Sequence, residues 1–217
     1  IGGKPMLQRV LEQCKKAIDT SKIVLCTDSE KLSSLAKNLS INSILTSESC
    51  DSGTDRIASV IDKLIEISSN SFNNYPYENI DDLKKGTLII NVQGDQPFLD
   101  PKVIKEMCSF FYGASELPSV VTPIYKLQKE SIHNPSVVKV LVNRNSEALY
   151  FSRSALPHIR DKNKDEWHLY YDYWGHVGIY GFRADILSNW ESLQSSKLEN
   201  SEKLEQLRFV DAGIKIK

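Results

Sequence analysis

The chain has 217 residues, and its 27 basic and 28 acidic side chains give a formal net charge of −1. This length suits one α/β domain with an ample core, and the balanced charge, with no block of like charges, gives no indication of a nucleic-acid partner or a polybasic membrane anchor. No apolar run approaches the roughly 20 residues that span a bilayer, so we expect no membrane insertion.

The four cysteines are Cys14, Cys26, Cys50 and Cys108, which lie far apart and form no C-x-x-C pair. This spacing favours free thiols in a reducing compartment over a disulfide framework or a zinc site. We therefore expect a cytoplasmic protein.

Helical and extended patterns alternate through the first part of the chain. Apolar residues at helical spacing predict a helix over 5–17, with Pro5 in its first turn. A strand over 22–27, a helix over 28–39, a strand over 43–46 and a helix over 57–67 follow. This alternation predicts an α/β fold with three layers, in which a mainly parallel, doubly wound, Rossmann-like mixed sheet is covered by helices.

The segment 88–97 reads Leu-Ile-Ile-Asn-Val-Gln-Gly-Asp-Gln-Pro. An unbroken apolar run that ends in turn residues predicts a strand buried on both faces of a parallel sheet. Asp95 then lies just past the carboxyl end of the sheet, where ligands collect, and could hold a cation and through it a phosphate. Taken alone, Asp95 is equally well explained as a turn residue or a helix N-cap.

The polar segment 68–85 is rich in Ser and Asn and predicts a surface loop. Beyond it we expect a helix over 103–111 and a strand over 119–123. Strands over 137–142 and 148–151 follow in quick succession and predict a small antiparallel excursion. The segment 156–173 shows no clear period, and a strand over 176–182, helices over 184–189 and 203–207, and a strand over 214–216 complete the chain.

The segment Ser-Gly-Thr-Asp-Arg at 52–56 combines hydroxyls, a glycine and a guanidinium beside a predicted helix start. Such a combination can bind a phosphate or a base edge, although a plain helix N-cap formed by Ser52 or Thr54, with Arg56 solvated, is the better interpretation when the segment is taken alone. No Walker pattern G-x-x-x-x-G-K-[ST] occurs.

Further candidates lie in the second half of the chain. Arg153 follows an aromatic strand and is a cation of the kind that pairs bidentately with a carboxylate. His176 and Tyr180 lie four residues apart on one predicted strand, so both could point into one cleft. Glu205 and Gln206 lie on the predicted helix 203–207. A surface salt bridge, a core-edge pair and a solvated helix face are the simpler interpretations of these residues when each is taken alone.

Seven short segments occur in a fixed order along the chain: Gly-Lys-Pro-Met (3–6), Ser-Gly-Thr-Asp-Arg (52–56), Asn-Val-Gln-Gly-Asp-Gln-Pro (91–97), Asn-Pro (134–135) with Val-Lys-Val (138–140), Ala-Leu-Tyr-Phe-Ser-Arg (148–153), His-Val-Gly-Ile-Tyr-Gly (176–181) and Leu-Glu-Gln-Leu-Arg (204–208). The series closely resembles the 3-deoxy-manno-octulosonate (Kdo) cytidylyltransferases, the CMP-Kdo synthetases of lipopolysaccharide biosynthesis. The resemblance covers essentially the whole chain.

The resemblance implies a homodimeric enzyme that transfers CMP from CTP to the anomeric hydroxyl of Kdo, with Mg²⁺ as cofactor and pyrophosphate as the leaving group. It implies that Asp95 and Gln93 are catalytic and that Asp95 holds the metal. The nucleotide would be bound by Ser52, Gly53, Arg56 and Gln93. The sugar would be bound by Arg153, His176, Tyr180, Glu205 and Gln206, where Arg153 or His176 meets the carboxylate and Glu205 and Gln206 meet the hydroxyls.

The sequence departs from the family pattern at both ends. The family's phosphate-clamp loop would lie just before Ile1, and a segment with a second metal carboxylate would follow Lys217. We assign no clamp role to Lys4, which belongs to the second Gly-Lys-Pro of the family pattern. We therefore expect a single nucleotidyltransferase domain over 1–217, without its N-terminal strand and C-terminal segment, that could fold yet be inactive.

Two alternatives stay open. One is a cytidylyltransferase for another sugar acid, such as neuraminate or 8-amino Kdo, because the cytidine half of the site would be shared. The other is a nucleotide-binding module without catalytic activity.

Overall fold

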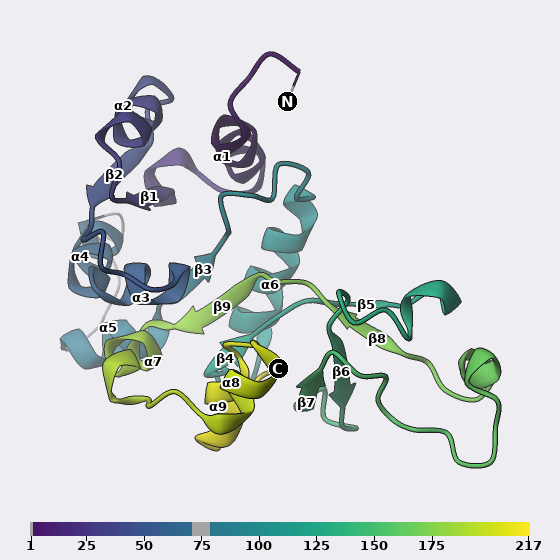
Figure 1. Ribbon diagram of the computed structural model, residues 1–217. Helices are drawn as coiled ribbons and strands as arrows, with labels where there is room; N and C mark the ends of the chain where they lie inside the picture. The colour runs from purple at the N-terminus through teal and green to yellow at the C-terminus, as the bar shows by residue number, and fades with distance from the viewer. Residues whose placement is uncertain (1, 71–78) are drawn as a thin grey trace. The chain divides into compact units, whose positions relative to one another are not determined.

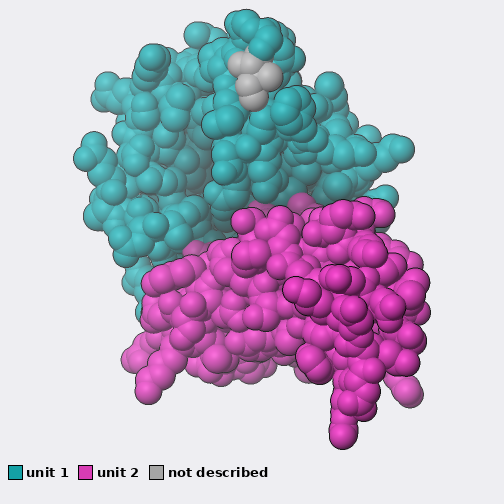
Figure 2. All heavy atoms as spheres, turned by 45° about the vertical axis from the view of Figure 1, so that its right-hand side comes forward, with its two compact units in different colours: residues 1–117, 179–192 teal, residues 118–178, 193–217 magenta. Residues whose placement is uncertain are grey.

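The computed structural model describes residues 2–70 and 79–217 (Figure 1). The chain divides into two compact units, which Figure 2 shows in different colours: unit 1 comprises residues 1–117 and 179–192, and unit 2 comprises residues 118–178 and 193–217. The expectation of a single domain stays a prediction.

Unit 1 begins with the predicted alternation of helices and strands. Its first elements are α1 (Met6–Ala17), β1 (Val24–Thr27), α2 (Glu30–Asn38) and β2 (Asn42–Leu45), with a short 3-10 helix η1 (Thr20–Lys22) before β1. Helix α1 starts after Pro5 and buries Val10, Leu11 and Cys14. Strand β1 pairs in parallel with β2, with Val24 opposite Asn42. The predictions for this part of the chain are confirmed.

The middle of unit 1 differs from the sequence-based expectation in two places. The single helix predicted over 57–67 is two helices, α3 (Gly53–Ala58) and α4 (Ile61–Asn70), and Ser59 at the break donates from its hydroxyl to the Arg56 carbonyl at 2.8 Å. The loop predicted over 68–85 is wrong at both ends, because α4 continues to Asn70 and α5 spans Ile80–Gly86. The Asn79 side chain caps the N-terminus of α5, because it accepts from the Asp81 and Asp82 N–H groups. The polar composition of this segment gave no indication of the helix. Residues 71–78 of the predicted loop lie outside the described residues.

The remaining elements of unit 1 are β3 (Leu88–Asn91), α6 (Pro101–Gly113), β9 (Tyr180–Arg183), α7 (Ala184–Ser188) and the 3-10 helix η4 (Trp190–Ser192). Helix α6 begins where Asp100 caps the Lys102 N–H, and it buries Ile104, Met107 and Phe111. Strand β3 pairs with β9, and the pairing is antiparallel.

Strands β1 and β3 each leave one edge open. Within the described residues, β1 pairs along its length only with β2, and β3 pairs in unit 1 only with β9. Residues 21–27 and 87–94 line the same cavity of about 740 Å³. Neighbouring residues of a strand point to opposite faces, so consecutive residues can line one cavity only along the strand's edge. Leu88, Ile89 and Ile90 are consequently half-buried, whereas the sequence predicts a strand buried on both faces.

Unit 2 contains a four-stranded antiparallel sheet in the order β5-β8-β6-β7. Its strands are β5 (Ile124–Lys126), β6 (Lys139–Val142), β7 (Ala148–Ser152) and β8 (Trp174–His176). The predicted antiparallel excursion is confirmed. The other elements are β4 (Val120–Val121), the 3-10 helices η2 (Lys129–Ser131) and η3 (Lys164–Leu169), α8 (Lys197–Glu202) and α9 (Leu207–Asp211). Of the terminal strand predicted over 214–216, only Ile216 forms a bridge, with Val120.

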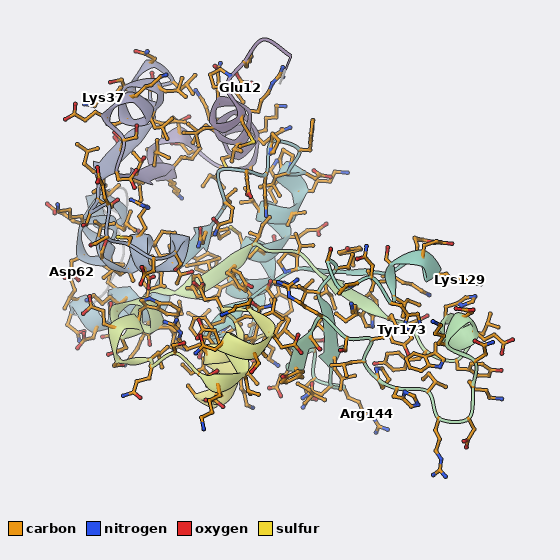
Figure 3. All side chains as sticks on the ribbon, in the orientation of Figure 1. Glu12, Lys37, Asp62, Lys129, Arg144 and Tyr173 are labelled. Atoms are coloured by element: carbon orange, nitrogen blue, oxygen red, sulfur yellow. The ribbon has the colours of Figure 1, made fainter. Side chains whose placement is uncertain are left out.

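Aromatic side chains order the segment of unit 2 that shows no period in the sequence. Tyr173, labelled in Figure 3, is 1% exposed and its ring lies parallel to that of Trp167, with centroids 6.4 Å apart. Its hydroxyl donates to the Pro157 carbonyl at 2.6 Å. Leu127 and Ile132 complete this small core.

The α/β class with parallel and antiparallel pairing is confirmed. No helix in the described part of the chain is both long and apolar enough to cross a membrane. The four cysteines are free thiols, and burial raises the pKa of Cys14 and of Cys26 to about 11.

Candidate functional site

The predicted nucleotide residues gather in unit 1, where β1 and β3 end. The cavity beside these strands is apolar over most of its wall, but Thr27, Arg56, Asn91 and Gln93 line it as well. Thr27 is the last residue of β1 and Asn91 is the last residue of β3. The polar wall therefore lies where open α/β sheets bind ligands.

Ser52 is the N-cap of α3. Its hydroxyl oxygen accepts from the Asp55 N–H at 3.1 Å, so the N-cap interpretation of this segment is confirmed. A hydroxyl that accepts one hydrogen bond can still donate another, so the cap does not remove Ser52 from a nucleotide site.

Arg56 is held by groups that follow two different strands. Its Nη2 donates to the Asp28 carboxylate at 2.8 Å, and its Nη1 donates to the Thr46 hydroxyl at 2.5 Å and the Ser47 carbonyl at 3.3 Å. Asp28 comes directly after β1, and Thr46 comes directly after β2. The guanidinium is thus fixed at the carboxyl ends of the parallel pair.

Gly53 and Gln93 approach each other closely. A Cβ atom on Gly53 would lie 2.9 Å from Gln93 Nε2, which is closer than real Cβ atoms come to a neighbour, and 3.1 Å from Gln93 Oε1, which is a tight contact. Both residues line the cavity together with Arg56. The structure therefore brings three of the predicted nucleotide residues to one wall, and a side chain on Gly53 would move the Gln93 amide.

Asp95 lies on an exposed turn just past β3, in which the Gln96 N–H donates to the Gln93 carbonyl at 3.2 Å. The described residues contain no group of three or more His, Cys, Asp or Glu side chains that could hold a metal ion without other ligands. One exposed carboxylate fits a Mg²⁺ ion that takes its other oxygens from phosphates and water, because Mg²⁺ commonly binds one or two carboxylates in this way.

The expectation that His176 and Tyr180 share one strand is wrong. His176 ends β8 in unit 2, whereas Tyr180 begins β9 in unit 1. Between them the chain leaves the ladder, and the Val177 N–H donates to the Pro123 carbonyl at 3.0 Å. The period-two argument for a shared face holds only along a continuous strand, so it does not apply here.

The surroundings of His176 define its protonation. Its Nε2 lies 2.9 Å from the Thr122 hydroxyl, and that hydroxyl donates its one hydrogen to the Val177 carbonyl at 3.2 Å. Burial beside the Phe151 ring lowers the pKa of His176 to about 4. The ring is neutral at physiological pH.

Arg153 lies just past the end of β7. Its Nε donates to the Glu202 carbonyl at 2.8 Å, its Nη1 to the Pro135 carbonyl at 3.2 Å and its Nη2 to the Lys203 carbonyl at 3.5 Å. All three acceptors are backbone carbonyls, which holds the guanidinium in place without neutralising it. The surface salt bridge that sequence reasoning offered as the simpler interpretation does not describe this arrangement.

The helix predicted over 203–207 is wrong. Helix α8 ends at Glu202, Lys203 adopts the left-handed conformation with φ of +54°, and α9 begins at Leu207. Glu205 and Gln206 therefore lie on the corner between two helices. The period gave no sign of this break, because a left-handed residue other than glycine is uncommon.

Gln206 is the one buried side chain in the described part of the chain whose amide nitrogen has no partner. The residue is 3% exposed, and its Nε2 makes no hydrogen bond. Leaving a buried donor unpaired costs roughly 1–3 kcal/mol, so such a group calls for an explanation. An acceptor on a bound ligand would satisfy it.

Sequence reasoning missed four residues that contact the predicted site residues: Asp28 bonds Arg56, Thr122 lies against His176, and Lys139 and Glu202 bond Arg153. Asp28 could have been found, because it directly follows a predicted strand just as Asp95 does. Lys139 could have been found as the one charged residue within the apolar run 137–142. Thr122 and Glu202 act through contacts with residues 54 and 50 positions away, which no local pattern shows.

The family model described as Cytidylyltransferase matches residues 1–216. A 3-deoxy-manno-octulosonate cytidylyltransferase of Parabacteroides distasonis is 35% identical over 220 residues, which cover all of this chain and 80% of the relative. A relative of the same name from Polynucleobacter necessarius is 36% identical over 218 residues, which cover all of this chain and 77% of that protein. The solved structure of a CMP:2-keto-3-deoxy-manno-octonic acid synthetase complexed with CTP matches with a TM-score of 0.82 and 32% identity, over all of this chain and 79% of the other. This chain belongs to the cytidylyltransferase family.

Proposed function

We propose that this protein transfers CMP from CTP to the anomeric hydroxyl of Kdo, which releases pyrophosphate and gives CMP-Kdo for lipopolysaccharide biosynthesis. The observation that carries this function is the match to the CTP-complexed synthetase over the whole chain, with a TM-score of 0.82. The curated relatives carry the name of the same activity.

Residues of unit 1 bind CTP in this proposal. The guanidinium of Arg56 lies at the carboxyl ends of β1 and β2 and offsets phosphate charge, while Ser52 and Gln93 offer polar groups to the nucleotide. Asp95 and phosphate oxygens would hold Mg²⁺, which supplies positive charge against the charge that develops on the phosphates. The chain's own contribution is to orient the α-phosphate for attack by the sugar hydroxyl.

Residues of unit 2 bind the sugar acid. The neutral ring of His176 carries no positive charge to pair with the sugar carboxylate, so in this proposal the Arg153 guanidinium binds the carboxylate. Each Nη of Arg153 carries two hydrogens and can donate to a second acceptor besides its carbonyl. Gln206 Nε2 donates to a sugar oxygen, and the neutral His176 ring is a proposed contact of a sugar hydroxyl. Glu205, and Tyr180 of unit 1, remain proposed sugar contacts on the resemblance alone.

Pyrophosphate release measured with CTP, Kdo and Mg²⁺ tests the function. Release is expected only when all three are present, and chelation of the metal should stop it. Release with neuraminate or 8-amino Kdo but not with Kdo would transfer the assignment to another sugar acid. Calorimetry that shows CTP binding by a protein without turnover of any sugar acid would favour a nucleotide-binding module.

We also propose a cytoplasmic homodimer. The four free thiols fit a reducing compartment, and the dimer rests on the family resemblance. Sedimentation at two protein concentrations tests the dimer, and a mass of one chain at both would contradict it.

A further inference from the structure

Lys139 is a fully buried cation at the start of β6. The residue is 0% exposed, and its Nζ donates to the Asn134 carbonyl at 2.8 Å, to the Val137 carbonyl at 2.7 Å and to the Arg153 carbonyl. An ammonium has three N–H groups, so these three carbonyls use all of them. Burial lowers the pKa of Lys139, and the nearby Glu202 carboxylate acts in the opposite direction.

Burying the Lys139 ammonium costs more free energy than burying an apolar side chain at the same position. A buried charge is costly unless it is fully hydrogen-bonded, and an apolar side chain of similar length often serves stability equally well. The ammonium provides three directed hydrogen bonds, which fix the turn around Asn134–Val137 to the end of β7. A methylene chain could not hold these carbonyls together.

The backbone segments that Lys139 joins are the ones that hold Arg153. The Arg153 carbonyl accepts from Lys139 Nζ, and the Arg153 guanidinium donates to the Pro135 and Glu202 carbonyls. The Glu202 carboxylate in turn accepts from the Ser152 hydroxyl at 2.6 Å and from the Arg153 N–H at 2.9 Å. One connected network thus includes the 134–137 turn, the end of β7 and the end of α8.

The same network fixes the corner that carries Glu205 and Gln206. Glu202 is the last residue of α8, and the left-handed turn at Lys203 follows it directly. The Lys203 carbonyl accepts from Arg153 Nη2 at 3.5 Å. The Arg153 guanidinium thus binds the carbonyls of Glu202 and Lys203, where the chain leaves α8.

We propose that Lys139 is a positioning residue for the sugar-acid site, because its buried ammonium fixes the backbone of Arg153 to the 134–137 turn, and Arg153 in turn bonds the end of α8, just before Glu205 and Gln206. This inference rests on the proposed function, since it assigns these three residues to the sugar. Lys139 itself does not contact the substrate, because its three N–H groups all donate to backbone carbonyls.

The test measures KM for Kdo and KM for CTP in the Lys139→Met variant, which keeps the length of the side chain and removes the charge. KM for Kdo is expected to rise by about tenfold or more, the effect of losing hydrogen bonds to a charged group, while KM for CTP stays within about twofold. Lys139→Arg keeps the charge and should restore part of the affinity for Kdo. Lys215→Met is the matched control in unit 2, because Lys215 is exposed and only pairs with Glu147 at 3.1 Å.

A folded Lys139→Met protein with unchanged KM for Kdo, or with equal rises in both KM values, overturns the proposal. If this variant does not fold, Glu202→Gln replaces it and must show the same selective rise. Hydrogen exchange gives a readout that needs no turnover: the amides of residues 152–154 and 203–206 should exchange faster in either variant, and unchanged exchange would also overturn the proposal. Turnover of Kdo by the unmodified protein tests the proposed function separately.

Discussion

The two units hold their proposed site residues in different ways. In unit 1, Gln93 and Asp95 lie on a turn just past a strand with an open edge, and the Asp95 side chain is exposed. In unit 2, Arg153 is held by a network that includes Lys139 and Glu202, and Gln206 lies buried on the corner that follows α8. Substitutions on the turn of unit 1 should therefore change activity alone, whereas substitutions in the network of unit 2 should change activity and stability together.

The largest effect is expected from Asp95→Asn. Loss of the proposed metal carboxylate should reduce Mg²⁺-dependent turnover by about 1000-fold, the scale of several kcal/mol of charge stabilisation. The free energy of unfolding should not change, because Asp95 is exposed on a turn. Asp211→Asn, an exposed carboxylate in unit 2, is the control. An active Asp95→Asn enzyme would refute the metal role.

His176 should make the stability of unit 2 depend on pH. The ring has a pKa of about 4 in the folded protein, below the ordinary value of 6.5, so the unfolded chain binds more protons between these values. The free energy of unfolding should therefore fall by about 3 kcal/mol between pH 7 and pH 4 through this residue. Urea unfolding at both pH values measures the fall, and His176→Gln should lose that part of it. Equal pH dependence in both proteins would contradict the neutral ring.

Arg153→Lys tests whether one residue of unit 2 contributes both to sugar binding and to stability. Lysine keeps the charge but loses the planar fork, so KM for Kdo should rise by about 100-fold. The melting temperature should fall as well, because the guanidinium binds carbonyls of Pro135, Glu202 and Lys203. A rise in KM for CTP of the same size would remove Arg153 from the sugar half of the site.

The smallest effect is expected from Gly53→Ala. The new methyl group would lie 2.9 Å from Gln93 Nε2 and should displace this flexible amide, which raises KM for CTP by about tenfold, the effect of one hydrogen bond of ordinary strength. Gly113→Ala is the matched control, because a Cβ there meets nothing within 4 Å. If both variants bind CTP equally well, Gly53 is not part of the nucleotide site.

The sequence predicts those helices and strands that are determined by residues close by in the chain. Helix α1 has a clear apolar face, and the apolar spacing over 103–111 predicts the middle of α6, which the structure extends to Pro101–Gly113. The placement of Asp95 past the end of β3 also follows from the apolar run alone.

The predictions fail where distant contacts decide the local structure. The strand expected over 176–182 splits because Val177 bonds to Pro123, and the helix expected over 203–207 splits at the left-handed Lys203. Apolar spacing reports which face of an element is buried, but not where a partner far along the chain interrupts it. The sugar half of the site depends on these interruptions and could not be placed from the sequence.

The open edges of β1 and β3 have a consequence for handling the protein. An unpaired strand edge is a template on which another chain can add a strand, which is a common route to aggregation. Along β3 the exposed edge carries the apolar residues Leu88, Ile89 and Ile90. Solubility at high concentration should therefore depend on whether an extended segment occupies this cavity. An occupant would join two sheets into one and stiffen the turn that carries Gln93 and Asp95.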